Sequence, residues 1–488
     1  GGGSTDTETV GVYTACVSEE ALPGPPNTMQ RLKGVANGAS TEMAGALEIS
    51  HTKIRRSSEA LQGDRSEIEV KGVGNLEAMY SLAFTFAFAG TVPSTFYAAS
   101  VYWDEDTTYY GVEVNVTLEN KWVAYCPTST FAEPFAATAN LCYWFAGLGL
   151  FLLPFFSGDH MPPKTFGVGM LVSFLGAASM AFHAAASTPG NWRHAADRFG
   201  MYMVFGYLAV AVLHSLFQAC IGQPTHPASP VGVITNVAAM VVMIGTVIWQ
   251  EDISSEVFLL YTGLIIFLAN GTTMGTLASR RAVLSRVPSD NGSFGDRAVV
   301  FAKGFAYSFV PRIICLASGF YINGRSAEHK MTSFNEYKSV ASTTALGVYT
   351  DDNMNEYLVE LRKLHDFSHG TWHFLSAFCI MSMGLTVVEG LSGVLDSDDW
   401  ASTPELISMI SAMALSLLFV AMEALDASSS TYLTVWLIAT FTLFPASIWS
   451  LSRLVKLQRR QVRAYRKEQS AEGKQGEVEL EEGVGERV

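Results

Sequence analysis

Charged residues are scarce in this chain of 488 residues. They make up 16% of it, whereas ordinary soluble domains carry about 25%. Cysteine is scarce as well, with 6 scattered residues and no visible disulfide framework, which argues against a small cross-linked secreted fold. The net charge is −14 and no long basic stripe is present, so we expect no nucleic-acid partner.

Apolar residues are abundant, at 49% of the chain. A bilayer core needs about 20 consecutive apolar residues to be crossed by a helix, and several windows of that length contain almost no charge. The sequence therefore predicts an all-α, polytopic membrane protein. The ten predicted spans are 78–103, 135–157, 165–187, 198–220, 230–249, 256–279, 298–322, 367–391, 405–422 and 432–451.

Both ends of the chain are polar. Residues 1–76 are rich in Gly, Ser, Thr and Glu and contain no apolar run that resembles a signal peptide, so we expect a disordered segment. Residues 454–488 are first basic and then acidic, and we expect a tail there.

Loop charge predicts the orientation, because Lys and Arg are enriched on the cytoplasmic side. A basic cluster directly follows the last span, and counting back through ten spans places the N-terminal segment on the same side. Both termini are therefore predicted to be cytoplasmic. The sequon at Asn115 falls on the opposite side, where a glycan can be attached.

Ionisable residues stand inside or beside several spans. Such residues cost about 2.5–3.5 kcal/mol at the centre of a membrane helix, so each is a functional-site hypothesis. Ser179 and His183 are four residues apart, hence on one helical face, and Asp197 stands at the head of the next span. His369 and His373 have the same spacing, by which one helix offers two imidazoles to a metal.

Glu133 and Asn140 form a third pair, seven residues apart and again on one face. The predicted topology brings all three groups to a similar depth on the non-cytoplasmic side. Three neutral imidazoles plus a water are a catalytic zinc arrangement with one open position. The sequence therefore predicts a Zn²⁺ site formed by His183, His369 and His373.

Each group also has a plainer interpretation. The two histidines of one helix can be a packed or interfacial pair, and a serine is common at contacts between membrane helices. Asp197 can cap its own helix, since an acid is favoured at a helix N-terminus. Their conjunction is more specific than any one of them.

The pattern resembles the signature of the CREST superfamily of membrane hydrolases. It consists of Ser179-x-x-x-His183, Asp197 at the next helix start, and His369-Gly-Thr-Trp-His373. The superfamily includes the alkaline ceramidases, the progestin and adiponectin receptors, the lipid-remodelling hydrolases that act after GPI attachment, and the myomaker-like proteins. Residues 179–190 resemble the myomaker-like branch most.

The resemblance covers residues 131–391, which hold seven of the ten spans, the number that the superfamily uses. It implies a seven-helix core there. One extra span with its outward loop precedes the core in 77–130, and two extra spans follow it in 392–453. The resemblance also implies that the three histidines bind zinc, that Asp197 and Ser179 lie beside its water, and that Glu133 and Asn140 match the opening motif of the ceramidases.

The function predicted from these observations is a zinc-dependent hydrolase that cleaves an ester or amide bond in a membrane lipid. Asp197 would accept the water's proton and pass it to the leaving group, and Ser179 would donate a hydrogen bond to the oxyanion. The alternative is a non-catalytic lipid-sensing receptor or membrane-remodelling protein with a structural zinc. A haem carrier is a third class, but it needs two facing histidine pairs.

Two further features leave alternatives open. His365 precedes His369 by four residues and could compete as a ligand, but its place at the loop junction favours a surface histidine. The outward loop 323–364 contains an amphipathic pattern over 353–364, which fits either a lid over the site or a linker helix at the membrane interface.

Overall fold

The computed structural model describes residues 76–102, 133–157, 163–184, 192–221, 229–249, 255–284, 294–341, 352–392 and 403–453. All of them belong to one unit of the chain, Val70–Val488. The predicted N-terminal segment 1–76, apart from its last residue, the sequon at Asn115 and the tail 454–488 lie outside these ranges. The orientation across the membrane stays a prediction.

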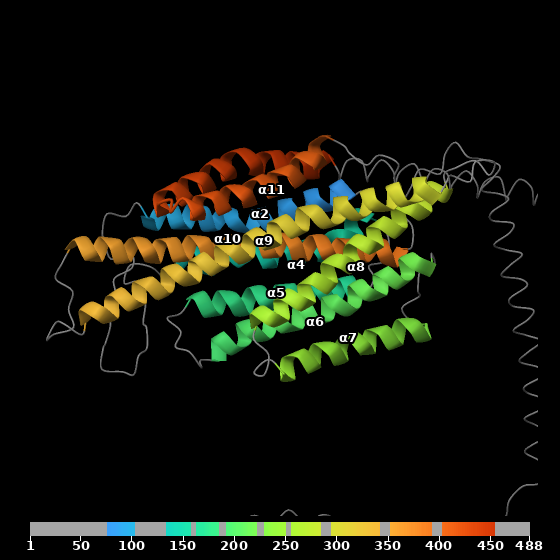
Figure 1. The fold of residues 1–488 in the computed structure, drawn as a ribbon, viewed down its shortest axis with the longest axis horizontal. Coiled ribbons are helices and arrows are strands. Elements are labelled where there is room, and N and C mark those ends of the chain that lie inside the picture. The colour runs from blue at the N-terminus through green and yellow to red at the C-terminus, as the bar shows by residue number, and fades with distance from the viewer. Residues whose placement is uncertain are drawn as a thin grey trace, which may run out of the picture. The chain divides into compact units, whose positions relative to one another are not determined.

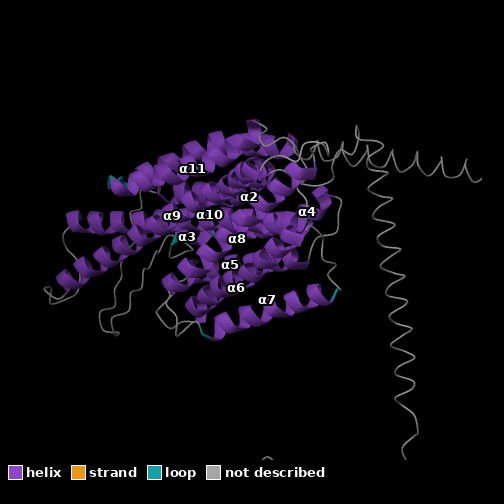
Figure 2. Ribbon diagram, turned by 45° about the vertical axis from the view of Figure 1, so that its right-hand side comes forward, coloured by secondary structure: helices purple, strands orange, loops and turns teal. Residues whose placement is uncertain are grey.

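The described residues are helical throughout, apart from short turns, and contain no strand (Figure 2). Ten helical stretches among them are long and apolar enough to cross a membrane, which confirms the predicted fold class and number of spans. A membrane-spanning segment forms a helix because a helix satisfies the backbone polar groups by its own hydrogen bonds. The bilayer core contains no water that could satisfy them instead. In chain order, the helices are α2 (Leu76–Tyr102), α3 (Pro134–Ala139), α4 (Leu141–Ser157), α5 (Pro163–Ala184), α6 (Trp192–Ile221), α7 (Pro230–Ile248), α8 (Ser255–Leu284), α9 (Phe294–Ala341), α10 (Asp352–Ser392) and α11 (Thr403–Ala424), followed by the span Ser429–Arg453.

Helix α10 is the centre of the bundle. Its apolar window in Glu360–Val387 is entirely buried, and it contacts α2, α3, α4, α5, α6, α8 and α9. Figure 1 shows α10 in orange between α2 and α11 on one side and α5 and α6 on the other. Helix α7 lies at the edge against α6, and only 17% of its apolar window is buried. The helix that carries the predicted His369–His373 pair is therefore the one most shielded from lipid.

The long predicted loop 323–364 is largely helical, so that prediction was wrong. Helix α9 continues through Ala341, and α10 begins at Asp352 and runs without a break into the histidine-bearing turns. The amphipathic pattern over 353–364 is thus the first part of α10 rather than a separate lid or linker helix. Apolar residues at helical spacing mark a helix, but they do not show where it ends.

The predicted span 135–157 also differs, because it is divided. Helix α3 ends at Ala139, Asn140 lies between the two helices, and α4 starts at Leu141. Residues 134–152 still form one candidate span. The short α3 brings Glu133 to the point where α5 ends, since the backbone N–H of Glu133 donates to the carbonyl of His183 at 3.1 Å.

Candidate metal centre

Three imidazoles from two helices converge at one end of the bundle. His183 lies in the last turn of α5, and His369 and His373 lie one turn apart on α10. One ring nitrogen from each of the three lies within 4.8 Å of the others. His183 and His373 are buried, and His369 is half-buried. This group, which we call the histidine cluster, could hold a metal ion, as the sequence predicted.

The distances within the histidine cluster fit a single small cation. Nitrogens bound to one tetrahedral zinc at about 2.0–2.1 Å lie about 3.3–3.4 Å apart. Nε2 of His183 and Nε2 of His369 are 3.2 Å apart. Both ring nitrogens of His373 are buried and have no hydrogen-bond partner within the described residues. Buried polar atoms rarely lack a partner, so a bound ion would explain His373.

A carboxylate orients His183. Oε2 of Glu133 lies 2.5 Å from Nδ1 of His183. When Nδ1 donates to this carboxylate, Nε2 carries the lone pair and faces His369. A carboxylate behind a metal-binding histidine fixes the tautomer and raises the basicity of the imidazole.

Glu133 is held ionised by its neighbours. Its other oxygen, Oε1, lies 3.1 Å from Nζ of Lys330 and 3.2 Å from Nε2 of His365. Burial opposes ionisation of Glu133, but the charge of Lys330 and the imidazoles of His365 and His183 outweigh it and hold its pKa well below the ordinary value. Lys330 is half-exposed on α9, so the histidine cluster approaches the surface beside it.

The position of Glu133 depends on Asp366. The buried carboxylate of Asp366 accepts hydrogen bonds from the backbone N–H groups of Phe135, at 2.9 Å, and Ala136, at 2.8 Å. These two N–H groups belong to the first turn of α3 and have no acceptor within the helix itself. Pro134, at the first helical position, has no N–H to satisfy. The carboxylate of Asp366 on α10 thus caps α3 and fixes Glu133, the residue that precedes α3.

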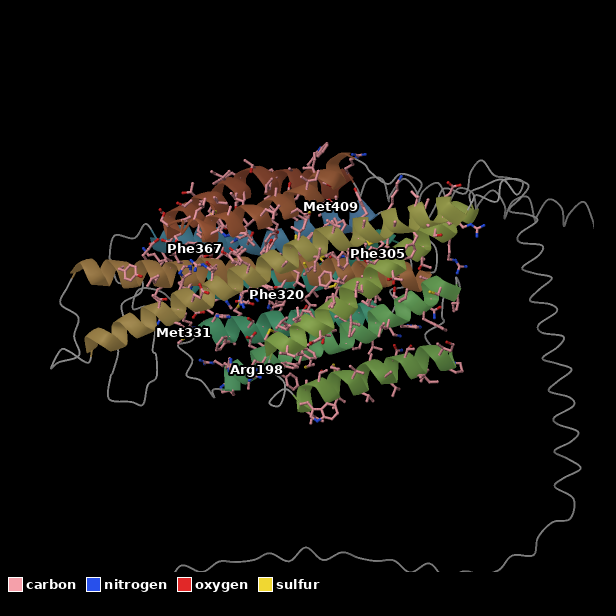
Figure 3. The ribbon with its side chains drawn as sticks, viewed as in Figure 1. Arg198, Phe305, Phe320, Met331, Phe367 and Met409 are labelled. Carbon is pink, nitrogen blue, oxygen red and sulfur yellow. The ribbon has the colours of Figure 1, made fainter. Side chains whose placement is uncertain are left out.

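Asp197 and Ser179 lie beside the histidine cluster. Asp197 occupies the second turn of α6 and is close enough to interact electrostatically with His183 and with Ser179. The Ser179 hydroxyl is buried one turn before His183. His194 also lies near Asp197, and its ring contacts Phe182 at 5.1 Å between centroids. Figure 3 shows Arg198, Met331 and Phe367, labelled on α6, α9 and α10, near the same end of the bundle.

One sequence-based expectation does not match the structure. His365 is not a surface histidine: it is 4% exposed and bonded to Ser326 at 2.7 Å and to Glu133. It is buried because α9 continues into the predicted loop region, where Ser326 of α9 packs against it. Asn140, predicted to support the site, lies between α3 and α4 and donates its amide N–H to the carbonyl of Ala136, and its role stays a prediction.

Lys330 and Asp366 were not identified from the sequence. Lys330 falls in the stretch that was interpreted as a loop, so nothing in the sequence placed it near Glu133. Asp366 stands inside the motif His365–His373, and its charge next to an apolar window was a usable signal. Its partners are backbone atoms of another helix, which no sequence pattern reveals.

The chain was compared with protein-family models, with curated proteins and with solved structures. None of them matches it, so the arrangement of its own residues carries the functional argument.

Proposed function

We propose that this protein is a zinc-dependent integral membrane hydrolase that cleaves an ester or amide bond of a lipid. The observation that carries the proposal is the convergence of three imidazoles inside a bundle of membrane-spanning helices, with a carboxylate behind one of them. The resemblance of these residues to the CREST signature supports the same activity.

The metal ligands in this proposal are His183, His369 and His373. A zinc ion held by three imidazoles with one open position lowers the pKa of a bound water to about 7 and polarises a carbonyl. Glu133 keeps His183 in the tautomer that can bind a metal. Asp366 does not contact the metal ligands directly in this proposal. It binds the backbone of α3 and so fixes the position of Glu133.

Asp197 is the proposed general base and acid. It lies near His183 from a different helix, so it can take the proton of the attacking water and return it to the leaving group of the lipid. The Ser179 hydroxyl lies beside Asp197, one turn before His183, and would donate to the oxyanion of the substrate carbonyl.

The proposed substrate is a lipid, because the histidine cluster is formed by membrane helices. The loop charges predict that this end of the bundle lies on the lumenal or extracellular side, and on that prediction a lipid of that leaflet is the expected substrate. We expect Lys330, half-exposed beside Glu133, to contact the polar headgroup of this lipid.

The test is hydrolysis by the purified full-length protein. Release of fatty acid is measured from a phospholipid, a GPI lipid and a ceramide, each in mixed micelles. His369→Ala should abolish release, and Asp197→Asn should retain bound zinc but lose about 10²–10⁴-fold in rate.

Lys303→Met is the control, since Lys303 is an exposed residue of α9 outside the proposed site. It should leave the rate unchanged. If none of the lipids is cleaved while removal of zinc unfolds the protein, the metal is structural and the hydrolase proposal is wrong.

A further inference from the structure

A second polar group lies at the other end of α5. Lys164, the second residue of that helix, is 4% exposed, and its ammonium donates to Asn236 at 2.8 Å and to Thr235 at 3.0 Å, both on α7. Lys164 and His183 are separated by 19 helical residues, or about 28 Å along the axis. This group is therefore independent of the histidine cluster.

Lys164 is a buried cation whose partners among the described residues are neutral. An ammonium has three N–H donors, and the two described hydrogen bonds go to a hydroxyl and to an amide oxygen. Among the described residues no carboxylate contacts it. Lysine at a membrane helix end usually extends toward the headgroups, but here it turns inward between α5 and α7.

His214 of α6 offers a second hydrogen-bond donor near Lys164. Its ring is 6% exposed and lies within electrostatic reach of Lys164. Nε2 of His214 accepts from the amide nitrogen of Gln218 at 3.1 Å, so the ring proton is on Nδ1. Nδ1 is buried and has no partner in the described part of the chain, and neither does Oε1 of Gln218.

We propose that Lys164, His214 and Gln218 form a binding site for the phosphate headgroup of an acidic membrane lipid. Lys164 and the Nδ1–H of His214 would donate to the phosphate oxygens, and Oε1 of Gln218 would accept from a hydroxyl of the same headgroup. A phosphate supplies the charge that this buried ammonium lacks.

The surroundings favour a lipid over a free ion. Among the described helices, α7 packs mainly on α6. The rest of its surface is exposed. Large apolar side chains next to the group face outward, including Leu213 and Phe217 on α6 and Ile234 and Val237 on α7. Acyl chains can lie along this surface while the headgroup reaches Lys164.

The experiment uses the full-length protein in mixed micelles. Native mass spectrometry measures the lipids retained, and thermal unfolding is followed after addition of phosphatidic acid, phosphatidylcholine or inorganic phosphate. Wild type should retain phosphatidic acid and be stabilised by it, and by neither of the other two. Lys164→Met should reduce retention at least about tenfold, and Lys164→Arg should preserve it.

Lys303→Met, the same change at an exposed lysine of α9, is the matched control and should behave as wild type. His214→Phe removes the Nδ1–H donor but keeps a ring, and it provides the test if Lys164→Met fails to fold. Equal retention by wild type and both variants would overturn the proposal. Equal stabilisation by inorganic phosphate and by phosphatidic acid would overturn the lipid as ligand.

Discussion

The carboxylate of Glu133 and the imidazole of His183 meet at 2.5 Å although 50 residues separate them in the chain. The same carboxylate contacts Lys330 on α9 and His365 on α10. One side chain at the start of α3 therefore links three long helices around the histidine cluster.

Glu133→Gln should weaken zinc binding by about 10–100-fold, because loss of the charge lowers the basicity of His183 and frees its tautomer. Zinc affinity is measured by competition with a chelator of known affinity. Glu328→Gln is the matched control, since Glu328 is 64% exposed and bonded to Arg325. Equal affinities in the two variants would show that Glu133 does not orient a metal ligand.

The purified wild-type protein should contain about one zinc per chain, and His183→Ala, His369→Ala and His373→Ala should each lose it. Inductively coupled plasma mass spectrometry gives the metal content. His214→Ala removes a buried histidine outside the histidine cluster and should keep the zinc. Zinc at wild-type level in all three variants would contradict a shared site.

Gly370→Ala should destabilise the protein by about 1–3 kcal/mol. A Cβ on Gly370 would lie 2.4 Å from Cδ1 of Phe135, a fully buried ring packed against Phe367 and Trp436. The displaced α3 would also move Glu133, so zinc affinity should fall. Denaturant or thermal unfolding in detergent measures the stability.

Gly324→Ala is the matched control for Gly370→Ala. Apart from its chain neighbours and the backbone of its own helix, no atom lies within 4 Å of the position of its Cβ, so alanine should stabilise α9 by up to about 1 kcal/mol. A similar stability change in both variants would mean that α3 does not pack closely on α10.

Glu423→Ala should destabilise the protein by about 2–5 kcal/mol. The buried carboxylate of Glu423 on α11 accepts hydrogen bonds from Ser368, from Tyr432 and, at 3.1 Å, from His329. Alanine leaves these buried groups without their acceptor. Glu328→Ala, at an exposed surface ion pair, should change the stability by less than about 1 kcal/mol.

Hydropathy alone predicted the spans because a bilayer imposes the same length and apolar content on every crossing helix. His214 shows how far such reasoning extends: it stands in the middle of a predicted span, and it is buried and hydrogen-bonded to Gln218. His365 shows where prediction from hydropathy fails. Its burial depends on the length of α9, and polar residues such as Asn323 and Arg325 gave no sign that the helix continues.

The sequence by itself determined the all-α membrane fold and the spacing of the histidines along one helix, because both follow from local periodicity and from the solvent. Only the tertiary structure decided that α5 ends against α3 and α10, that Asp366 caps α3, and that Lys330 reaches Glu133. Within a helix the backbone geometry sets the distance between two side chains. Between helices the distance is set by side-chain packing, which depends on residues far apart in the chain.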